Sequence, residues 1–181
     1  LFYGIYVSEI VSKQTNEIYS IKPESFFILD LQIHDNSTVF NNIYDCFDHY
    51  VKPDILEGDN AWFNEKTNKK EDVHKQIRFW NFPQIVIIAL NRFTPDGTKK
   101  INNLVSFPVD NLDLTPYVTG YNAVSYKYDL YGICNHIGGV TGGHYTAFVR
   151  NPENTWLHYN DRDVEKVDNP EAIISPATYC L

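Results

Sequence analysis

The chain has 181 residues and a mass of 21.0 kDa, the size of one domain or of a large part of one. Hydrophobic residues make up 43% of it and aromatic residues 15%, which suits a packed core and a β-rich fold. The net charge of −8 disfavours nonspecific binding to nucleic acid, and no apolar run approaches the ~20 residues that cross a membrane. We therefore expect neither nucleic acid nor a membrane among its partners.

The cysteines and the start of the chain indicate its compartment. Cys46, Cys134 and Cys180 are odd in number and form no Cys-x-x-Cys pair, so we expect reduced thiols in the cytoplasm or the nucleus. Residues 1–10 lack the charged start and the cleavage site of a signal peptide. Because the chain contains no methionine, we expect it to be cut from a longer protein.

Strand patterns dominate the first 110 residues. Apolar and polar residues alternate over residues 1–20, which predicts an antiparallel hairpin, and residues 26–33 predict a further strand. The polar stretch at 57–75 predicts a solvated hairpin tip. The continuous apolar run at 85–90 predicts the most buried strand of the chain, and a turn at 96–97 follows it.

One helix is expected between these strands. Apolar residues spaced from Val39 to Val51 predict a helix that is capped by Ser37 and ended by Pro53. Cys46 lies on or near the apolar side of this helix, where a small buried residue is expected rather than a nucleophile.

One stretch in the last third of the chain carries the candidate chemistry. A glycine-rich loop at residues 137–143 separates two strand-like segments, and His144 follows the loop directly. Residues 156–159 predict the neighbouring strand, which delivers Asn160 and Asp161 at its end. Two adjacent strands would then hold an imidazole beside an amide or a carboxylate. These groups are the base and the orienting group of a nucleophilic triad.

These residues resemble the histidine box of the ubiquitin-specific proteases, a family of papain-like cysteine peptidases that remove ubiquitin. The box is matched by Leu130, His136, Gly138, Gly142, Gly143, His144, Tyr145, Thr146 and Ala147, and then by Trp156, Tyr159, Asn160, Asp161 and Val164. A second family motif is matched by Pro83, Ile85, Val86, Leu90, Arg92 and Phe93. The resemblance covers nearly all of this chain, but only the later half of the family's catalytic domain.

The resemblance implies an α+β, β-rich, papain-like fold of palm and fingers, in which residues 1–181 form one partial catalytic domain. About residues 1–110 would form the fingers and central strands, and about 111–181 the palm with the histidine box. The fingers would hold no zinc, because Ser12 and Thr15 stand where the family often has cysteines, and hydroxyls are poor zinc ligands. We expect no cofactor.

The resemblance also implies which residues are catalytic. His144 would be the general base, and Asn160 would take the third triad position and orient the imidazole. Asp161 is the adjacent acid that several members of the family need, so which of the two side chains orients His144 stays open. We expect no metal at this site, since the spacing of the histidines does not require one.

The loop and its neighbours would contact the substrate. Gly138, Gly142 and Gly143 would let the loop move over the extended C-terminus of ubiquitin, whose small residues require a narrow channel. Tyr145 would form a wall of that channel. His136, at the start of the loop, is either structural or in contact with the substrate, and both interpretations stay open. The expected partners are ubiquitin or ubiquitinated proteins.

The thiol of the expected enzyme is not found in this chain. None of its three cysteines has the surroundings of the family's N-terminal cysteine box, and the thumb that carries that box is absent. We therefore expect a deubiquitinase whose nucleophile lies in the missing N-terminal half of its own domain, and we expect the 181 residues alone to be inactive. The alternative is a catalytically inactive ubiquitin-binding or scaffold module.

Overall fold

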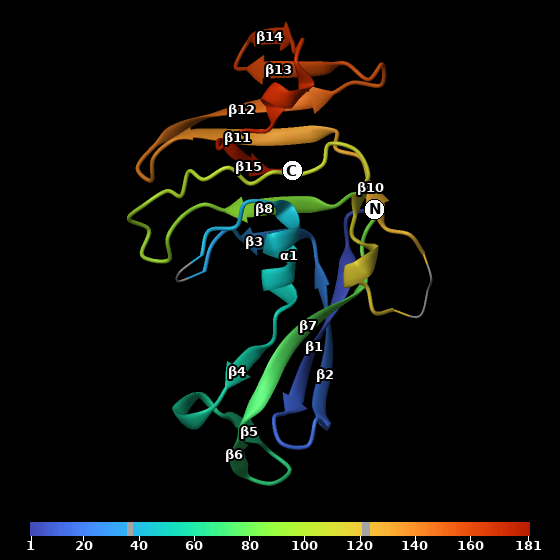
Figure 1. Cartoon of the computed structure of the whole chain (residues 1–181), viewed down its shortest axis with the longest axis vertical. Coiled ribbons are helices and arrows are strands. Elements are labelled where there is room, and N and C mark those ends of the chain that lie inside the picture. Colours follow the sequence, from blue (N-terminus) through green and yellow to red (C-terminus); the bar gives the residue numbers. More distant parts are fainter. Residues whose placement is uncertain (36–37, 121–123) are drawn as a thin grey trace. The chain divides into compact units, whose positions relative to one another are not determined.

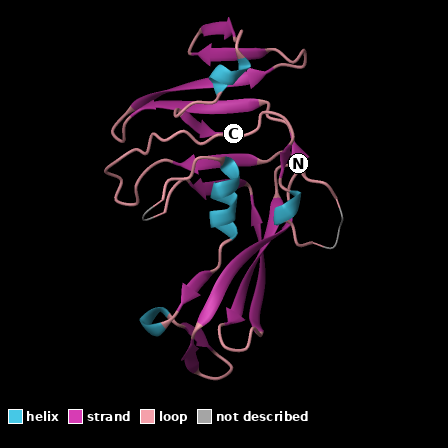
Figure 2. Ribbon diagram, viewed as in Figure 1, coloured by secondary structure: helices cyan, strands magenta, loops and turns pink. Residues whose placement is uncertain are grey.

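The computed structural model describes residues 1–35, 38–120 and 124–181, so the predicted cap Ser37 lies outside the described residues. The described residues contain fifteen strands, one α-helix and three short 3-10 helices (Figures 1 and 2). They form two compact units, each assembled from three segments of the chain. Unit 1 comprises Leu1–Phe27, Asp48–Val86 and Leu114–Tyr126, and unit 2 comprises Ile28–Phe47, Ile87–Asp113 and Lys127–Leu181.

Unit 1 is built on a four-stranded antiparallel sheet with the order β2-β1-β7-β4. The elements are β1 (Gly4–Ser12), β2 (Ile18–Phe26), β4 (Asp54–Leu56), β7 (Val73–Asn81) and the 3-10 turns η1 (Gly58–Asn60) and η2 (Thr115–Tyr117). The predicted hairpin is thereby confirmed, and its turn is held by Ser12, whose Oγ accepts from the backbone N–H of Thr15 at 3.1 Å. The rings of Phe26, Phe79 and Phe82 pack against one another with centroids 4.5 to 6.1 Å apart.

The predicted polar hairpin in unit 1 is formed by β5 (Trp62–Asn64) and β6 (Lys69–Glu71). Its side chains meet at Glu71, where Oε1 accepts from Oγ1 of Thr67 at 2.6 Å and from Nδ2 of Asn64 at 3.0 Å. These hydrogen bonds lower the pKa of Glu71, and the bond from Thr67 contributes most. Side-chain hydrogen bonds of this chain therefore close the hairpin tip.

Unit 2 is built on a seven-stranded sheet with the order β14-β13-β12-β11-β15-β8-β3 (Figure 1). Its strands are β3 (Ile28–Gln32), β8 (Ile87–Asn91), β11 (Gly132–Gly138), β12 (Gly143–Arg150), β13 (Trp156–Asn160), β14 (Asp163–Lys166) and β15 (Thr178–Cys180). β3 and β8 are parallel and the other neighbours are antiparallel. A two-stranded pair, β9 (Leu112–Asp113) and β10 (Lys127–Tyr128), and the 3-10 helix η3 (Pro170–Ile173) complete the unit.

The core of unit 2 begins at the parallel pair of strands. Leu29 and Leu31 of β3 pair with Ile88 and Leu90 of β8, and all four side chains are buried. A strand of continuous apolar sequence is expected where both faces of a sheet are covered. The predicted strand is present at residues 87–91, but Ile88 and Leu90 alternate with side chains of intermediate exposure, so only one of its faces is fully buried.

The helix α1 spans Ile43–Val51 and is shorter than its sequence pattern predicts. Oδ1 of Asn42 accepts from the backbone N–H of Asp45 at 3.0 Å, and Nδ2 of Asn42 donates to Oδ2 of Asp45 at 2.7 Å. This reciprocal capping fixes the first turn of the helix. The prediction that the helix already includes Val39 and Phe40 is therefore wrong.

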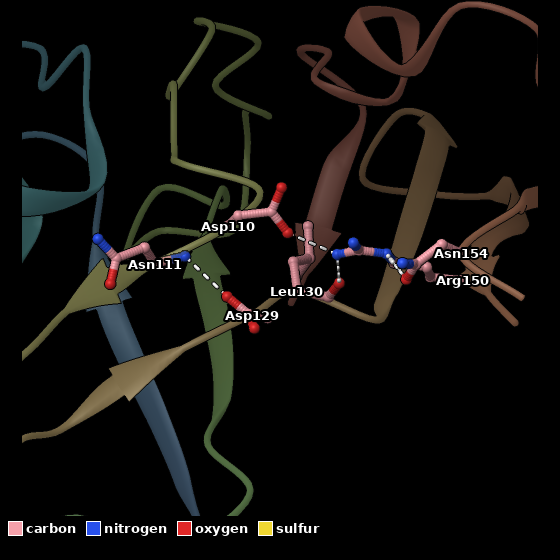
Figure 3. A network of polar contacts seen from close by, with 6 residues as sticks. All are labelled: Asp110, Asn111, Asp129, Leu130, Arg150 and Asn154. Carbon is pink, nitrogen blue, oxygen red and sulfur yellow. Dashed lines mark hydrogen bonds and ion pairs between the residues drawn. The ribbon is translucent and has the colours of Figure 1, made fainter. Parts of the chain in front are cut away.

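A polar network fixes the end of β12 to two neighbouring loops (Figure 3). The guanidinium of Arg150 donates to a carboxylate oxygen of Asp110 at 2.6 Å and to Oδ1 of Asn154 at 3.1 Å. Asp129 accepts from the backbone N–H of Asn111 at 2.9 Å. These contacts hold the end of β12 that lies opposite to the glycine-rich loop.

The two units do not correspond to a division of the chain at residue 110. Each unit contains segments from both sides of residue 110. The assignment of residues 1–110 to fingers and of 111–181 to a palm stays a prediction. Among the helices formed by the described ranges, none is long and apolar enough to cross a membrane.

Candidate active site

The hairpin of β11 and β12 presents His144 next to a tight connection. The strands pair up to Gly138 opposite Gly143, and residues 139–142 join them. Gly138 has a φ of +130°, and a Cβ at this position would lie 2.6 Å from the carbonyl oxygen of Gly142. Only glycine fits there without strain. The glycine at position 138 therefore fixes where β12 begins, and this in turn fixes the position of His144 in the strand.

His144 and Asn160 lie on one face of the sheet. Phe148 pairs with His158 across β12 and β13, and side chains two residues apart in a strand share a face. His144 thus lies on the face of Phe148, and Asn160 on the same face beside His158. In this diagonal arrangement Nε2 of His144 and Oδ1 of Asn160 are 2.6 Å apart.

The hydrogen bond determines which nitrogen of the imidazole keeps a free lone pair. Oδ1 of Asn160 is an acceptor, so Nε2 of a neutral His144 carries the proton and donates. Nδ1 of His144 then keeps its lone pair. The ring is exposed, so this lone pair is open to a proton donor that approaches the sheet. The pair thus has the form of a base held by an orienting group.

Asp161 occupies a turn instead of facing His144. It has a φ of +52° in the connection between β13 and β14 and is exposed. Among the described residues its side chain has no hydrogen-bond partner, whereas Asn160 contacts the imidazole directly. The geometry therefore favours Asn160 as the orienting group, and a role for Asp161 stays a prediction.

His136 and Tyr145 lie on the other face of the hairpin. They are paired opposite each other in β11 and β12, and Tyr145 directly follows His144, so their side chains point away from the face of the imidazole. The ring of His136 is 5% exposed and lies 4.9 Å from that of Tyr145. The structural interpretation of His136 gains support from this burial, and its contact with a substrate stays a prediction.

The remaining predicted contact residues are accessible. Gly138, Gly142 and Gly143 are exposed, and the side chain of Tyr145 is 56% exposed. An extended peptide could therefore contact them. The predicted substrate role of these four residues is compatible with their exposure and is not tested by it.

None of the three cysteines is a partner for His144. Cys46 is fully buried in α1, and this burial is the largest cause that raises the pKa of its thiol to about 12. Burial also raises the pKa of Cys134 and of Cys180, which pair with each other across β11 and β15. Cys134 lies opposite Ala147, on the face that does not carry His144. A raised pKa disfavours the thiolate form of all three, and a nucleophile outside this chain stays a prediction.

Three residues that surround His136 at the base of the loop could not be predicted as neighbours from the sequence. Lys100 donates its ammonium hydrogen to the carbonyl oxygen of His136, and Phe93 and Tyr179 flank the ring of His136. In the sequence, Phe93 stands out only as part of the second family motif. These residues are far apart in the sequence, so no local pattern indicates that they meet.

The described residues offer no metal centre. No group of three or more His, Cys, Asp or Glu side chains among them could hold an ion. The expectation that the protein needs no zinc and no cofactor stays a prediction.

The comparisons with known sequences identify one family. The sequence profile described as ubiquitin carboxyl-terminal hydrolase matches residues 1–181. Ubiquitin carboxyl-terminal hydrolase 10 of Arabidopsis thaliana is 36% identical over 143 residues, which are 77% of this chain and 15% of the relative. Ubiquitin carboxyl-terminal hydrolase 12 of Saccharomyces cerevisiae is 37% identical over 147 residues, which are 76% of this chain and 11% of the relative.

Solved structures show the same fold. A chain of the SAGA DUB module with Ubp8 bound to monoubiquitin matches with a TM-score of 0.85 and 27% identity, over 100% of this chain and 40% of that chain. The same module bound to ubiquitin aldehyde matches with a TM-score of 0.84 and 25% identity, over 99% of this chain and 40% of that chain. The predicted α+β, β-rich fold is thereby confirmed. The chain spans less than a fifth of the two sequence relatives and 40% of the two solved chains.

Proposed function

Because the chain belongs to the ubiquitin carboxyl-terminal hydrolase family, we propose that the protein containing it is a cysteine-type deubiquitinase. It hydrolyses isopeptide or peptide bonds at the C-terminus of ubiquitin. The observation that carries the proposal is the hydrogen bond between Nε2 of His144 and Oδ1 of Asn160, on an exposed face of the sheet. This chain contributes the base, its orienting residue and part of the surface that holds the ubiquitin tail.

The nucleophile in this proposal is a cysteine from a segment outside these 181 residues. Nδ1 of His144 takes the proton of that thiol, and the resulting thiolate and imidazolium form an ion pair. Asn160 stabilises the imidazolium, because Oδ1 accepts the Nε2 hydrogen bond in both protonation states. The surroundings of Cys46, Cys134 and Cys180 support an external thiol, since burial raises the pKa of all three.

The reaction then proceeds in two steps. The thiolate attacks the carbonyl carbon at the ubiquitin C-terminus, a C–S bond forms, and the C–N bond breaks as the imidazolium of His144 gives its proton to the leaving amine. A water molecule then attacks the thioester carbon while His144 accepts a proton from it, a C–O bond forms and the C–S bond breaks. The cysteine thiolate is regenerated, and ubiquitin leaves with a free C-terminal carboxyl group. Asn160 holds one orientation of the ring through both transfers.

The glycine-rich loop and Tyr145 contact the ubiquitin tail in this proposal. Gly138, Gly142 and Gly143 present backbone without side chains, which suits a narrow channel for an extended peptide. Tyr145 adds an exposed ring beside them. Support comes from the matching solved chains, whose DUB module is bound to monoubiquitin in one structure and to ubiquitin aldehyde in another.

We also propose the cytoplasm or the nucleus as the location. Three free cysteines are compatible with a reducing compartment. Ubiquitin and ubiquitinated proteins are the proposed partners, together with the N-terminal half of the same catalytic domain.

A ubiquitin probe with a C-terminal electrophile tests the function in the full-length protein. Wild type should be labelled covalently, and labelling should fall at least tenfold in His144→Ala. His158→Ala is the matched control, since His158 lies on the same face of the neighbouring strand and does not contact His144 in this proposal. Binding of the probe without any covalent labelling of wild type would instead indicate a catalytically inactive ubiquitin-binding module.

A further inference from the structure

An aromatic box surrounds the buried ring of His136 behind the candidate active site. His136 lies in β11 with 5% of its surface exposed. The box is formed by Phe93, Tyr145 and Tyr179, whose ring centroids lie 5.9, 4.9 and 6.0 Å from that of His136. All four residues belong to unit 2. The position of the imidazole of His136 is therefore set by packing from several parts of that unit.

The ring of His136 rests against the backbone that carries the catalytic base. A Cβ at Gly143 would lie 2.3 Å from Nε2 and 3.0 Å from Cδ2 of His136, so the ring edge occupies the space of a side chain there. Gly143 directly precedes His144. Any displacement of the His136 ring therefore changes the support of the peptide group that joins Gly143 to His144.

The backbone of His136 is fixed on both sides as well. Its N–H donates to the carbonyl of Ala177 at 2.9 Å, and its carbonyl oxygen accepts from the ammonium group of Lys100. These bonds tie β11 to the segment before β15 and to the chain that follows β8. The ring thus rests on a fixed support.

We propose that His136 is a positioning residue for His144, because its ring supports the Gly143 backbone and sets the place of the imidazole relative to Asn160. The inference rests on the proposed function and adds a residue that acts on the base from the opposite face of the sheet. His136 itself does not touch the reacting atoms.

The support acts through shape and not through charge. Burial, and secondly the nearby Lys100 ammonium, lower the pKa of His136, so its ring is neutral at physiological pH. A neutral side chain with an atom near the position of Nε2 should therefore replace it. Glutamine meets this requirement, whereas alanine leaves the backbone of Gly143 without support.

Separate measurement of kcat and KM in the full-length protein tests the proposal, with ubiquitin carrying a fluorogenic C-terminal amide as substrate. His136→Ala should lower kcat about 10- to 100-fold, since a displacement near 1 Å has this effect on a catalytic group, and should leave KM within about twofold. His136→Gln should recover kcat to within about threefold of wild type.

Ile133→Ala is the matched structural control. Ile133 is 2% exposed in the same strand and is paired with Phe148, away from the loop. This variant should lower the melting temperature without lowering kcat more than about twofold. Equal losses of kcat in Ile133→Ala and His136→Ala, or an unchanged kcat in His136→Ala, would overturn the positioning role.

A spectroscopic measurement separates this proposal from the proposed function. The Nε2 proton of His144 should give a hydrogen-bonded NMR resonance that disappears in Asn160→Ala, shifts in His136→Ala and stays in place in Ile133→Ala. An inactive wild-type protein would refute the deubiquitinase function alone. An unshifted resonance in His136→Ala would refute the positioning role whatever the activity.

Discussion

Removing the amide of Asn160 should slow hydrolysis without unfolding the protein. In Asn160→Ala the imidazole of His144 loses the acceptor that lies 2.6 Å from Nε2. A hydrogen bond to a charged group contributes about 1.5 to 3 kcal/mol, and this bond is strongest when His144 is protonated. Converted at 1.36 kcal/mol per factor of ten, kcat should fall about 10- to 150-fold.

The conservative variant tests the direction of the effect. In Asn160→Asp a carboxylate accepts the same hydrogen bond and stabilises the imidazolium more strongly than an amide does. Hydrolysis should therefore persist in Asn160→Asp, and a loss of kcat as large as that in Asn160→Ala would contradict the orienting role.

Steady-state hydrolysis by the full-length protein is the assay, and Asn154→Gly is the control. Asn154 also accepts a hydrogen bond from a cationic group, Arg150, but at the far end of β12, and glycine keeps its φ of +59° without strain. A kcat of Asn160→Ala within twofold of wild type would refute the orienting role. If Asp161→Ala then abolished turnover, the adjacent acid would be the orienting group.

Three further predictions concern the supporting structure. Arg92→Lys should lower the free energy of unfolding, measured by urea denaturation, by about 2 to 4 kcal/mol. Arg92 is fully buried and its guanidinium donates to three backbone carbonyls, which one ammonium group cannot replace. An unchanged denaturation midpoint would contradict this. Gly138→Ala should lower kcat/KM more than about tenfold, because its backbone conformation and its neighbours leave no room for a Cβ. Gly132→Ala should leave kcat/KM unchanged, because no atom lies within 4 Å of the added Cβ. Equal effects of the two variants would refute the strain at Gly138. Asp96 has its pKa lowered to about 2, mainly by the hydrogen bond from Thr94, so its stabilising contribution is complete above about pH 4 and is lost as the pH falls towards 2. Asp96→Asn should remove this part of the acid dependence in urea denaturation between pH 5 and pH 2, and an identical pH dependence would contradict the assignment.

The contact between the side chains of His144 and Asn160 could be predicted, because the strands that carry them are indicated by local sequence patterns. Strand alternation and the glycine-rich connection predict two neighbouring strands, and their register follows from the hairpin. The next strand along the chain then pairs with the first two in sequence order, so the imidazole and the amide share a face.

The interruption between β10 and β11 could not be predicted in this way. Alternating residues from Tyr128 to Asn135 predict one strand, yet β10 ends at Tyr128 and β11 begins at Gly132. Asp129 accepts instead from the backbone N–H of Asn111, 18 residues earlier in the chain. The alternation of residues within a strand does not indicate that a contact with a distant loop interrupts the strand.

The start of α1 shows a similar competition between nearby signals. Ser37 and Asn42 are both good caps, and the apolar residues between them fit a helix. Asn42 is followed three residues later by Asp45, and the two side chains bond reciprocally. The backbone N–H of Phe40 is already engaged by the carbonyl of Ile33, so the helix begins only after Asn42.

The burial of His136 depends on contacts that no segment predicts alone. Its alternation with Ile137 assigns it a face, but only the folded chain brings Phe93, Tyr179 and Lys100 against it. A histidine beside a glycine-rich loop is therefore equally compatible with a substrate contact and with an internal support.

Two glycines of the loop fix the register of the hairpin of β11 and β12. Gly138 and Gly143 are paired across the hairpin, and a Cβ on either would collide with backbone atoms at 2.6 Å. Because side chains alternate with a period of two, a shift of β12 by one residue would move His144 to the face of Tyr145 and away from Asn160. Side-chain space is less restricted between them, since added side chains at Gly139 and Gly142 meet no atom within 4 Å. In the proposed function, the paired glycines thus keep His144 on the face of Asn160 when a peptide contacts the connection between them.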